Sequence, residues 1–314
     1  MCEQIRALER VGKEYPTEHV ITAYQLNERM PMEFRNLSDC SFDTLYKGFG
    51  RAFADYQIHF EKEEIRSMLR RRGYDADLSF AFFDEGEIVA FTLNGTGTFD
   101  GIPTAYDTGT GTAKEYRGKG LAGEIFTRAT PYLKDAGIRQ YLLEVLHDNH
   151  KAIAVYRNLG FETTRHFDCF RQTIDKVNHT VHNPACTIRP IDLKAVADLQ
   201  SACDFAPSWQ NSIDSINRGQ ADLTMLGAFI GDVAAGHCVF DSATGDLTQI
   251  AVLPEFRRRG IASQLLHEAI RNMRTDFIKV LNVSSADEPL HAFLESMHIA
   301  AASRQLEMKL ALHG

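Results

Sequence analysis

The apolar and polar positions of this chain alternate between strand-like runs and helical spacings, and the same order of elements occurs twice. In the first half, apolar residues three and four positions apart predict helices, and short apolar or alternating runs predict strands. This half is expected to start at Met32–Arg35. Its expected elements are a helix capped by Ser38 or Asp39 that runs to about Phe53, a helix that carries Ile65, Met68 and Leu69, strands at Leu78–Phe83, Ile88–Gly95 and Tyr106–Ala113, a helix at Leu121–Leu133, a strand at Tyr141–Leu146, a helix marked by Ala152, Val155 and Leu159, and a strand at Phe161–Gln172.

The second half repeats this order. Its expected elements are a strand at Thr187–Pro190, a helix at Leu193–Ala202, strands at Leu223–Ile230, Val233–Phe240 and Leu247–Leu253, a helix at Ile261–Met273, a strand at Phe277–Val283, a helix at Leu290–Met297 and a strand at Ala301–Leu310. Strands and helices mixed in this order predict an α+β sheet domain, present twice.

A glycine-containing motif supports the repeat, because in each half it follows a predicted strand and precedes a predicted helix. The motif is Arg117-Gly118-Lys119-Gly120-Leu121-Ala122 in the first half and Arg257-Arg258-Arg259-Gly260-Ile261-Ala262 in the second. Further along the chain, Leu159-Gly160-Phe161 and Met297-His298-Ile299 keep nearly the same offset. A nearly constant offset indicates two copies of one domain.

These patterns divide the chain into four segments. Residues 1–31 are expected to form an N-terminal extension, and the general behaviour of chain termini favours loose docking. Residues 32–172 and 187–314 form the two predicted domains, of which the first is expected to be catalytic. The polar residues 173–186 between them form a predicted linker.

Two clusters of polar residues are interpreted as solvated surface. Arg70-Arg71-Arg72 ends the second predicted helix, where the helix dipole favours basic side chains. His179 and His182 lie in the predicted linker, without Cys, Asp or Glu at metal-ligand spacing. No metal site is therefore expected.

Composition and charge restrict the class of protein. The 314 residues contain 44% apolar and 24% charged residues, which is typical of a soluble globular protein. A formal net charge of −8 argues against nucleic acid as a partner, because nucleic-acid binding needs a basic surface. The six cysteines include no C-x-x-C pair and indicate reduced thiols in the cytoplasm. No apolar run reaches the ~20 residues of a membrane span and no signal-peptide pattern is present, so no membrane partner is expected.

The repeated motif has the chemistry of a phosphate cradle. A strand, a glycine loop and a helix start present backbone N–H groups and the positive end of the helix dipole to an anion. Glycine lets phosphates approach the backbone, and an arginine or lysine in the loop adds charge-assisted contacts. The strand before the first loop is expected to place Asp107, Gly109, Gly111 and Ala113 on one face, where small side chains would admit a ligand.

The chain resembles a tandem member of the GNAT superfamily of acetyl-CoA-dependent N-acetyltransferases. The stretches that carry the resemblance are Thr110–Ala122, Tyr141–Val145, Asn149–Phe161, Ile250–Ala262 and Lys279–Val283. The resemblance implies two tandem domains, each a central mixed sheet flanked by helices. It also implies acetyl-CoA as cosubstrate, no metal, and an amine of a small molecule or peptide as acceptor, whose identity is left open together with the oligomeric state.

The resemblance assigns cofactor contacts to both halves. In this family the loop holds the pyrophosphate of acetyl-CoA, and the pantetheine arm bonds to the backbone of two diverging strands as an added strand would. The positions concerned are Thr110, Gly111, Thr112, Arg117, Gly118, Lys119, Gly120, Leu121, Ala122, Asn149, Ile250, Ala251, Val252, Arg257, Arg258, Arg259, Gly260, Ile261 and Ala262.

Acetyl transfer from a thioester to an amine needs one group that accepts the amine proton and another that protonates the leaving thiolate. The resemblance gives the second role to Tyr156. We expect Glu144, on the central strand, to act as the general base. Asp107 and Asp148 are the competing candidates for that role.

The second half departs from the pattern at the catalytic positions, although its phosphate loop is intact. The replacements are Leu294 for Tyr156, Asp287 for Asn149 and Asn282 for Glu144. We therefore predict an acetyltransferase whose active centre lies in the first half. An active centre in the second half and a non-catalytic acyl-CoA-binding sensor are the alternatives. An aminoacyl-tRNA-dependent ligase on a tandem fold is disfavoured, because it would not need two acetyl-CoA loops.

Overall fold

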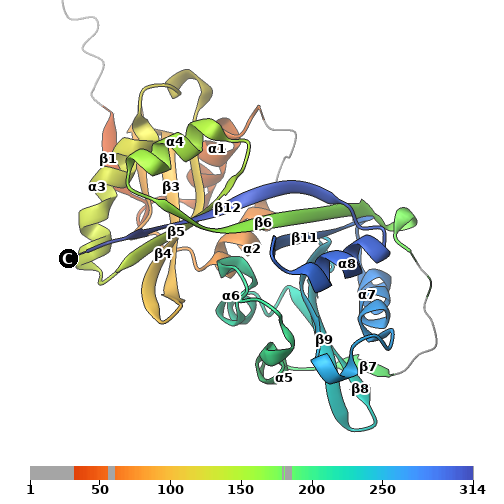
Figure 1. The fold of residues 1–314 in the computed structure, drawn as a ribbon. Helices are drawn as coiled ribbons and strands as arrows, with labels where there is room; N and C mark the ends of the chain where they lie inside the picture. The colour runs from red at the N-terminus through yellow and green to blue at the C-terminus, as the bar shows by residue number, and fades with distance from the viewer. Residues whose placement is uncertain (1–31, 56–60, 179, 181–185, 314) are drawn as a thin grey trace, which may run out of the picture.

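One mixed sheet of twelve strands runs through the described residues, with helices on both of its faces (Figure 1). The computed structural model describes residues 32–55, 61–178, 180 and 186–313. The strand order is β1-β2-β3-β4-β5-β12-β6-β11-β10-β9-β8-β7. The predicted mixed α/β class with two tandem repeats is confirmed. The expectation of a sheet for each half is modified, because the two half-sheets are continuous.

The first half contains the elements expected from its apolar pattern, together with a strand, β1, at its predicted start. They are β1 (Glu33–Asn36), α1 (Phe42–Ala52), α2 (Lys62–Arg72), β2 (Phe80–Asp84), β3 (Glu87–Phe99), β4 (Ile102–Thr112), α3 (Leu121–Asp135), β5 (Gln140–Leu146), α4 (His150–Asn158) and β6 (Glu162–Thr173). Helix α1 is capped by Ser41, whose Oγ accepts the N–H of Thr44 at 3.1 Å, and not by Ser38 or Asp39.

The second half repeats this order element by element, with α5 and α6 in the places of α1 and α2. Its elements are β7 (Thr187–Pro190), α5 (Leu193–Asp198), α6 (Ile213–Arg218), β8 (Leu223–Ile230), β9 (Val233–Asp241), β10 (Asp246–Val252), α7 (Ile261–Asn272), β11 (Phe277–Ser284), α8 (Glu288–Ser296) and β12 (Ala301–Ala311). Helix α6 is not predicted by the apolar pattern and lies against α2 of the first half.

The sheet is covered on both faces because its apolar side chains point alternately to either side. On one face of the first half, Phe83 and Phe91 pack with Phe49 and Ile65 of α1 and α2. On the other face, strand residues including Phe80 pack with Leu121, Ile125 and Ala129 of α3. Two helical layers therefore enclose the central strands.

The last strand of each half crosses into the sheet of the other half. Strand β12 lies between β5 and β6 and pairs antiparallel with both, while β6 pairs antiparallel with β11. In Figure 1, β12 (blue) reaches from the second half to the side of β5. Leu306 and Met308 of β12 join the first half's core, and Phe170 of β6 joins the second half's. The two halves therefore share cores, and the boundaries 32–172 and 187–314 stay a prediction.

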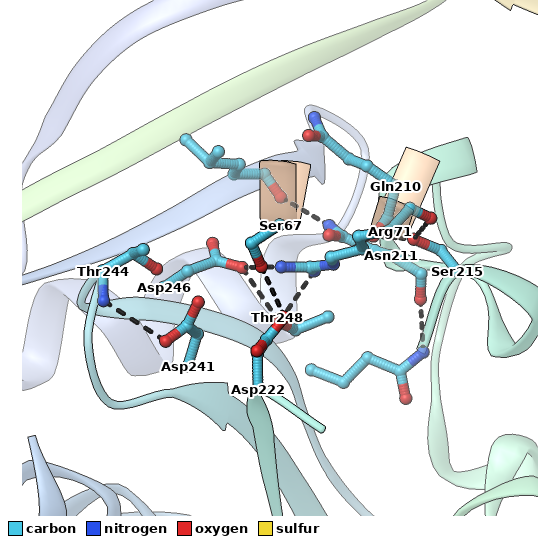
Figure 2. Close-up of polar contacts among 12 residues, drawn as sticks. Ser67, Arg71, Gln210, Asn211, Ser215, Asp222, Asp241, Thr244, Asp246 and Thr248 are labelled. Carbon is cyan, nitrogen blue, oxygen red and sulfur yellow. Dashed lines mark hydrogen bonds and ion pairs between the residues drawn. The ribbon is translucent and has the colours of Figure 1, made fainter. Parts of the chain in front are cut away.

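Arg71 is largely buried at the junction of the two halves. Figure 2 shows its polar contacts. Its Nη1 lies 2.7 Å from Oδ2 of Asp246, and the two side chains are only 15% and 7% exposed. Its Nη2 donates to the carbonyl oxygen of Gln210 at 3.0 Å and to Oγ1 of Thr248 at 2.9 Å. Burial alone would raise the pKa of Asp246, but the charges of Arg71 and Lys279 lower it.

Arg72 is also used at this junction. It donates to the carbonyl oxygen of Thr108 and to Oε1 of Gln210, both at 2.9 Å. The interpretation of Arg70-Arg71-Arg72 as a solvated helix end is therefore wrong for Arg71 and Arg72. Their partners lie far away in the sequence, so local helix rules do not reveal them.

Two predicted segments fall wholly or partly outside the described residues. These are the N-terminal extension, residues 1–31, and the part of the linker that contains His179 and His182. Within the described part of the linker, Val177 is buried in the core of the second half.

Candidate active site

Two neighbouring parallel strands diverge in each half and open a cavity between them. Strands β4 and β5 pair only where Thr104–Tyr106 lies beside Gln140–Leu142. Strands β10 and β11 pair only at Asp246 and Lys279. A cavity of about 660 Å³ occupies the opening in the first half, and one of about 460 Å³ occupies that in the second. The unpaired strand ends leave backbone groups available to a bound molecule.

Both glycine loops end at a helix start with free backbone donors. Gly118, Gly120 and Gly260 each have φ of 77°, and Arg258 has φ of 61°. Helices α3 and α7 have no side-chain hydrogen bond at their N-caps among the described residues, and the first N–H groups of a helix have no partner within the helix itself. At Gly120 the reason for glycine is its positive φ and not a lack of space. No described atom outside the adjacent residues lies within 4 Å of a Cβ built on Gly120.

The first arginine of each loop braces the loop. Arg117 donates to the carbonyl oxygens of Thr112 (3.1 Å) and Ala52 (2.8 Å) and lies 2.8 Å from Asp55. Arg257 makes the matching contacts to Val252 (2.8 Å), Ala202 (3.2 Å) and Asp204 (3.0 Å). These contacts hold each loop against the preceding strand, and the expected contact of the two side chains with phosphate stays a prediction.

Tyr156 and Asp107 meet inside the cavity of the first half. The hydroxyl of Tyr156 donates to Oδ2 of Asp107 at 3.2 Å, and Thr110 Oγ1 donates to the same oxygen at 2.8 Å. The other oxygen, Oδ1, is buried without a hydrogen-bond partner among the described residues. Burial raises the pKa of Asp107 to about 6, although Thr110 and Tyr156 lower it in part. Burial and the charge of Asp107 raise the pKa of Tyr156 well above its ordinary value, so its proton is retained at neutral pH.

A β-bulge brings Asp107 to the face of Tyr156. The pairing of β3 with β4 skips Thr108, so Asn94 faces Asp107 and Leu93 faces Gly109. The extra residue reverses the alternation beyond it. The expectation that Asp107 shares a face with Gly109 and Gly111 is therefore wrong.

Gly111 serves packing on the opposite face. A Cβ at this position would come within 2.8 Å of both Ala52 and Phe91. Its missing side chain makes room for helix α1, and not for a ligand as expected from the sequence. Its backbone, with those of Thr110 and Thr112, still lines the cavity.

Glu144 lines the cavity from the other face of the sheet. Tyr141 packs against Phe126 and Phe161, whereas Glu144, three residues later, accepts a hydrogen bond from the hydroxyl of Tyr106. Tyr106 is itself stacked on Trp209 of the second half, with ring centroids 5.2 Å apart. No sequence pattern indicates either contact of Tyr106, because both depend on tertiary packing.

The pKa of the Glu144 carboxyl lies near neutral pH. Burial raises its pKa to about 7, while the hydrogen bond from Tyr106 and the charge of Arg72 lower it. Glu144 is among the residues that line the cavity. Asp148, the other candidate base, is exposed and is not among the residues that line the cavity.

Asn149 lines the cavity and also caps helix α4. Its Oδ1 accepts the N–H of Ala152 at 3.2 Å. Asp287 caps α8 in the same way through Leu290, at 3.1 Å. The two positions are equivalent in the repeat, and their side chains are used by the helices.

The second half replaces the polar group around Tyr156 with apolar side chains. The bulge recurs there, because the pairing of β10 with β9 skips Thr248. Counting from this bulge, Leu247 stands in the place of Asp107 and Ile250 in that of Thr110, and Leu294 takes the place of Tyr156. Leu247 and Leu294 are fully buried. The second cavity therefore has no hydroxyl or carboxylate at these positions.

Comparison with known proteins identifies the family. Residues 42–161 and 193–299 match the acetyltransferase (GNAT) family, to which the chain belongs. The chain is similar to the mycothiol acetyltransferases of Saccharomonospora viridis, 34% identical over 113 residues, and Thermobifida fusca, 31% identical over 121 residues. The aligned segments cover 34% and 36% of this chain, and 37% and 38% of those two proteins. The family match extends over both halves of the chain, whereas the similarity to these relatives is confined to about a third of it.

Solved structures share the tandem fold. One is a tandem GNAT protein from the clavulanic acid biosynthesis pathway, with a TM-score of 0.69 and 13% identity over 90% of this chain and 99% of that protein. Another is a GCN5-related N-acetyltransferase from Sphaerobacter thermophilus, with a TM-score of 0.67 and 12% identity over 92% and 98% of the two chains. At these identities the likeness establishes the fold alone.

Neither a cluster of metal ligands nor a membrane-spanning helix is found in the described part of the chain. Across residues 32–55, 61–178, 180 and 186–313, there is no group of three or more His, Cys, Asp or Glu side chains arranged to hold a metal ion. None of the helices in those segments combines the length and apolar composition needed to cross a bilayer. The predicted cytoplasmic location stays a prediction.

Proposed function

We propose that this acyltransferase moves the acetyl group of acetyl-CoA to an amine of a small molecule or peptide, and that the reaction takes place in the first half. The observation that carries the proposal is the contact between Tyr156 and Asp107 in the opening between β4 and β5, below a glycine loop. The equivalent positions of the second half are apolar.

The residues of the first half fit a CoA thioester. The N–H groups from Gly118 to Ala122 would bind the diphosphate, since they lie at a helix start without competing acceptors. Backbone groups of Thr110–Thr112 would bond to the pantetheine arm along the unpaired part of β4. The second half offers equivalent groups at Ile250–Val252 and Arg257–Ala262, so we propose that it also binds the cofactor.

Two side chains would move the protons. Glu144 would accept the proton of the amine as the new C–N bond forms, because a pKa of about 7 leaves its carboxylate available at and above neutral pH. Tyr156 would donate its proton to the sulfur as the C–S bond breaks. Asp107 would orient the Tyr156 hydroxyl toward the cavity through their hydrogen bond.

Thiol release from acetyl-CoA, measured over a panel of amines, tests the proposal. Tyr156→Phe should lower turnover on the order of 10²-fold, the scale of a lost general acid, with nearly unchanged affinity for acetyl-CoA. Tyr132→Phe is the matched control, since Tyr132 is 55% exposed on α3 and its loss should leave turnover unchanged.

The two alternatives give different results. Turnover that survives Tyr156→Phe but is abolished by disruption of the Arg257–Ala262 loop would place the active centre in the second half. Calorimetry in the presence of a chelator measures acetyl-CoA binding separately. Tight binding without thiol release for any amine would favour the non-catalytic acyl-CoA-binding sensor.

A further inference from the structure

Strand β11 also carries a β-bulge, at the junction of the two halves. Strand β11 pairs with β6 through Val280 and Phe170, and then through Val283 and Asp168, so two residues of β11 stand opposite Cys169 alone. Asn282 is one of the two and has φ of 57°. Bulges of this kind redirect a side chain out of the regular alternation. Asn tolerates positive φ better than most residues do, which suits it to this place.

The bulge directs Asn282 at the carboxylate of the other half. Its Nδ2 donates to Oε1 of Glu144 at 3.3 Å and to Oγ of Ser208 at 3.2 Å. Asn282 is completely buried. Tyr106 donates to the other oxygen of Glu144, so the carboxylate is held by one donor from each half.

The equivalent strand of the first half has no such distortion. Strand β5 pairs with β12 without interruption from Gln140 to Leu146, and Glu144 lies opposite Glu307 in that register. Asn282 occupies in the second half the position that Glu144 has in the first. The exchange of β6 and β12 brings these two equivalent positions together, and only the second half bends its strand to make the contact.

We infer that Asn282 is a positioning residue for Glu144, so that the second half completes the acid–base apparatus of the first. This inference rests on the proposed function, in which Glu144 is the base. As a hydrogen-bond donor to the ionised carboxylate, Asn282 stabilises the charged form and keeps Glu144 available as a base near neutral pH. It also fixes the direction of the carboxylate toward the cavity.

Other groups around Glu144 set the background on which Asn282 acts. Tyr106, Arg72 and Arg165 favour the ionised form, whereas the buried Glu307 opposes it. Glu307 is itself paired with Arg165 and accepts from Thr164 at 2.7 Å. Cys169 lies beside Asn282 with its Sγ 3.8 Å from Oδ1. A change at position 282 leaves the charged groups around Glu144 in place and removes only the partner of the Cys169 thiol.

The pH dependence of kcat/KM tests the role of Asn282. Asn282→Gly removes the donor and suits the positive φ, and should move the acidic limb of the profile upward by about one pH unit. Turnover would then fall roughly five-fold at pH 7 and recover at pH 9, a recovery that a general packing defect would not show. Asn282→Asp keeps the size of the side chain but adds a second negative charge, and should move the limb further.

Ser208→Ala is the control, because it removes the other hydrogen bond of the same amide and leaves Glu144 untouched. The acidic limb of the kcat/KM profile of Ser208→Ala should stay at the pH of the unaltered protein. The double variant Glu144→Gln/Asn282→Asp exchanges donor and acceptor, and urea unfolding should show that it recovers part of the stability lost in the single variants. This second measurement does not depend on activity.

The outcomes separate the two proposals. Absence of acetyl transfer by the unaltered protein refutes the proposed function. An acidic limb that stays in place in active Asn282→Gly and Asn282→Asp proteins refutes the role of Asn282 alone. Additive stability changes in the double variant would likewise show that the two side chains do not interact, and would overturn the role inferred for Asn282.

Discussion

Replacing Glu144 by glutamine removes a carboxyl group that the fold keeps protonated well above its ordinary pKa. The folded protein raises this pKa from 4.5 to about 7, chiefly through burial. Between pH 4.5 and about pH 7, the folded state holds a proton on Glu144 that the unfolded state has released. The stability that this group contributes is therefore complete below pH 4.5 and is lost as the pH rises through 7.

The size of the effect follows from the two pKa values. Each unit of difference corresponds to about 1.4 kcal/mol, and most of the interval lies between pH 5 and pH 8. The free energy of unfolding of the unaltered protein should therefore fall by about 2 to 3 kcal/mol more than that of Glu144→Gln over this range. Asp107, whose pKa is raised to about 6, titrates in both proteins and cancels in the comparison.

Urea unfolding at pH 5 and pH 8 measures this difference directly. Asp148→Asn serves as the control, because Asp148 is exposed and outside the cavity, and its variant should follow the unaltered protein at both pH values. Acetyl transfer by Glu144→Gln should be strongly reduced at every pH. Parallel pH dependences for the unaltered protein and Glu144→Gln would show that the carboxyl has an ordinary pKa, and the argument for a poised base would fail.

Two further predictions concern the loop and the junction. Gly120→Ala should weaken binding of acetyl-CoA more than binding of acetyl-pantetheine, measured by calorimetry, because strain at φ of 77° distorts the N–H groups that face the diphosphate. Gly137→Ala, with φ of 84° at the far end of α3, should leave both affinities unchanged; equal losses for both ligands in Gly120→Ala would contradict the cradle. Arg71→Met should lower the free energy of unfolding by about 3 kcal/mol by leaving Asp246 buried and unpaired, and Asp246→Asn should restore most of it, whereas an unchanged urea midpoint in the single variant would refute this pairing.

The amino-acid sequence alone establishes the elements and the repeat. Apolar spacing locates the strands and helices, and the two copies of the glycine motif set their correspondence. These features are local, since a helix start or a strand depends on residues a few positions apart. The loop from Gly118 to Ala122 can therefore be proposed as a phosphate site from its residues, whereas the role proposed for Tyr156 also depends on the family resemblance.

How the two halves combine follows from contacts that are distant in the sequence. Which strand pairs with which depends on the whole chain, so the exchange of β6 and β12 leaves no mark in the apolar pattern. The bulges at Thr108 and at Asn282 each add one residue to a strand and reverse the facing of side chains, which periodicity alone misassigns. Local rules likewise predict a solvated helix end for Arg71 and Arg72, and no contact between Asn282 and Glu144. The fold places all three side chains against distant partners, because a charge or an amide removed from water needs a hydrogen-bond partner.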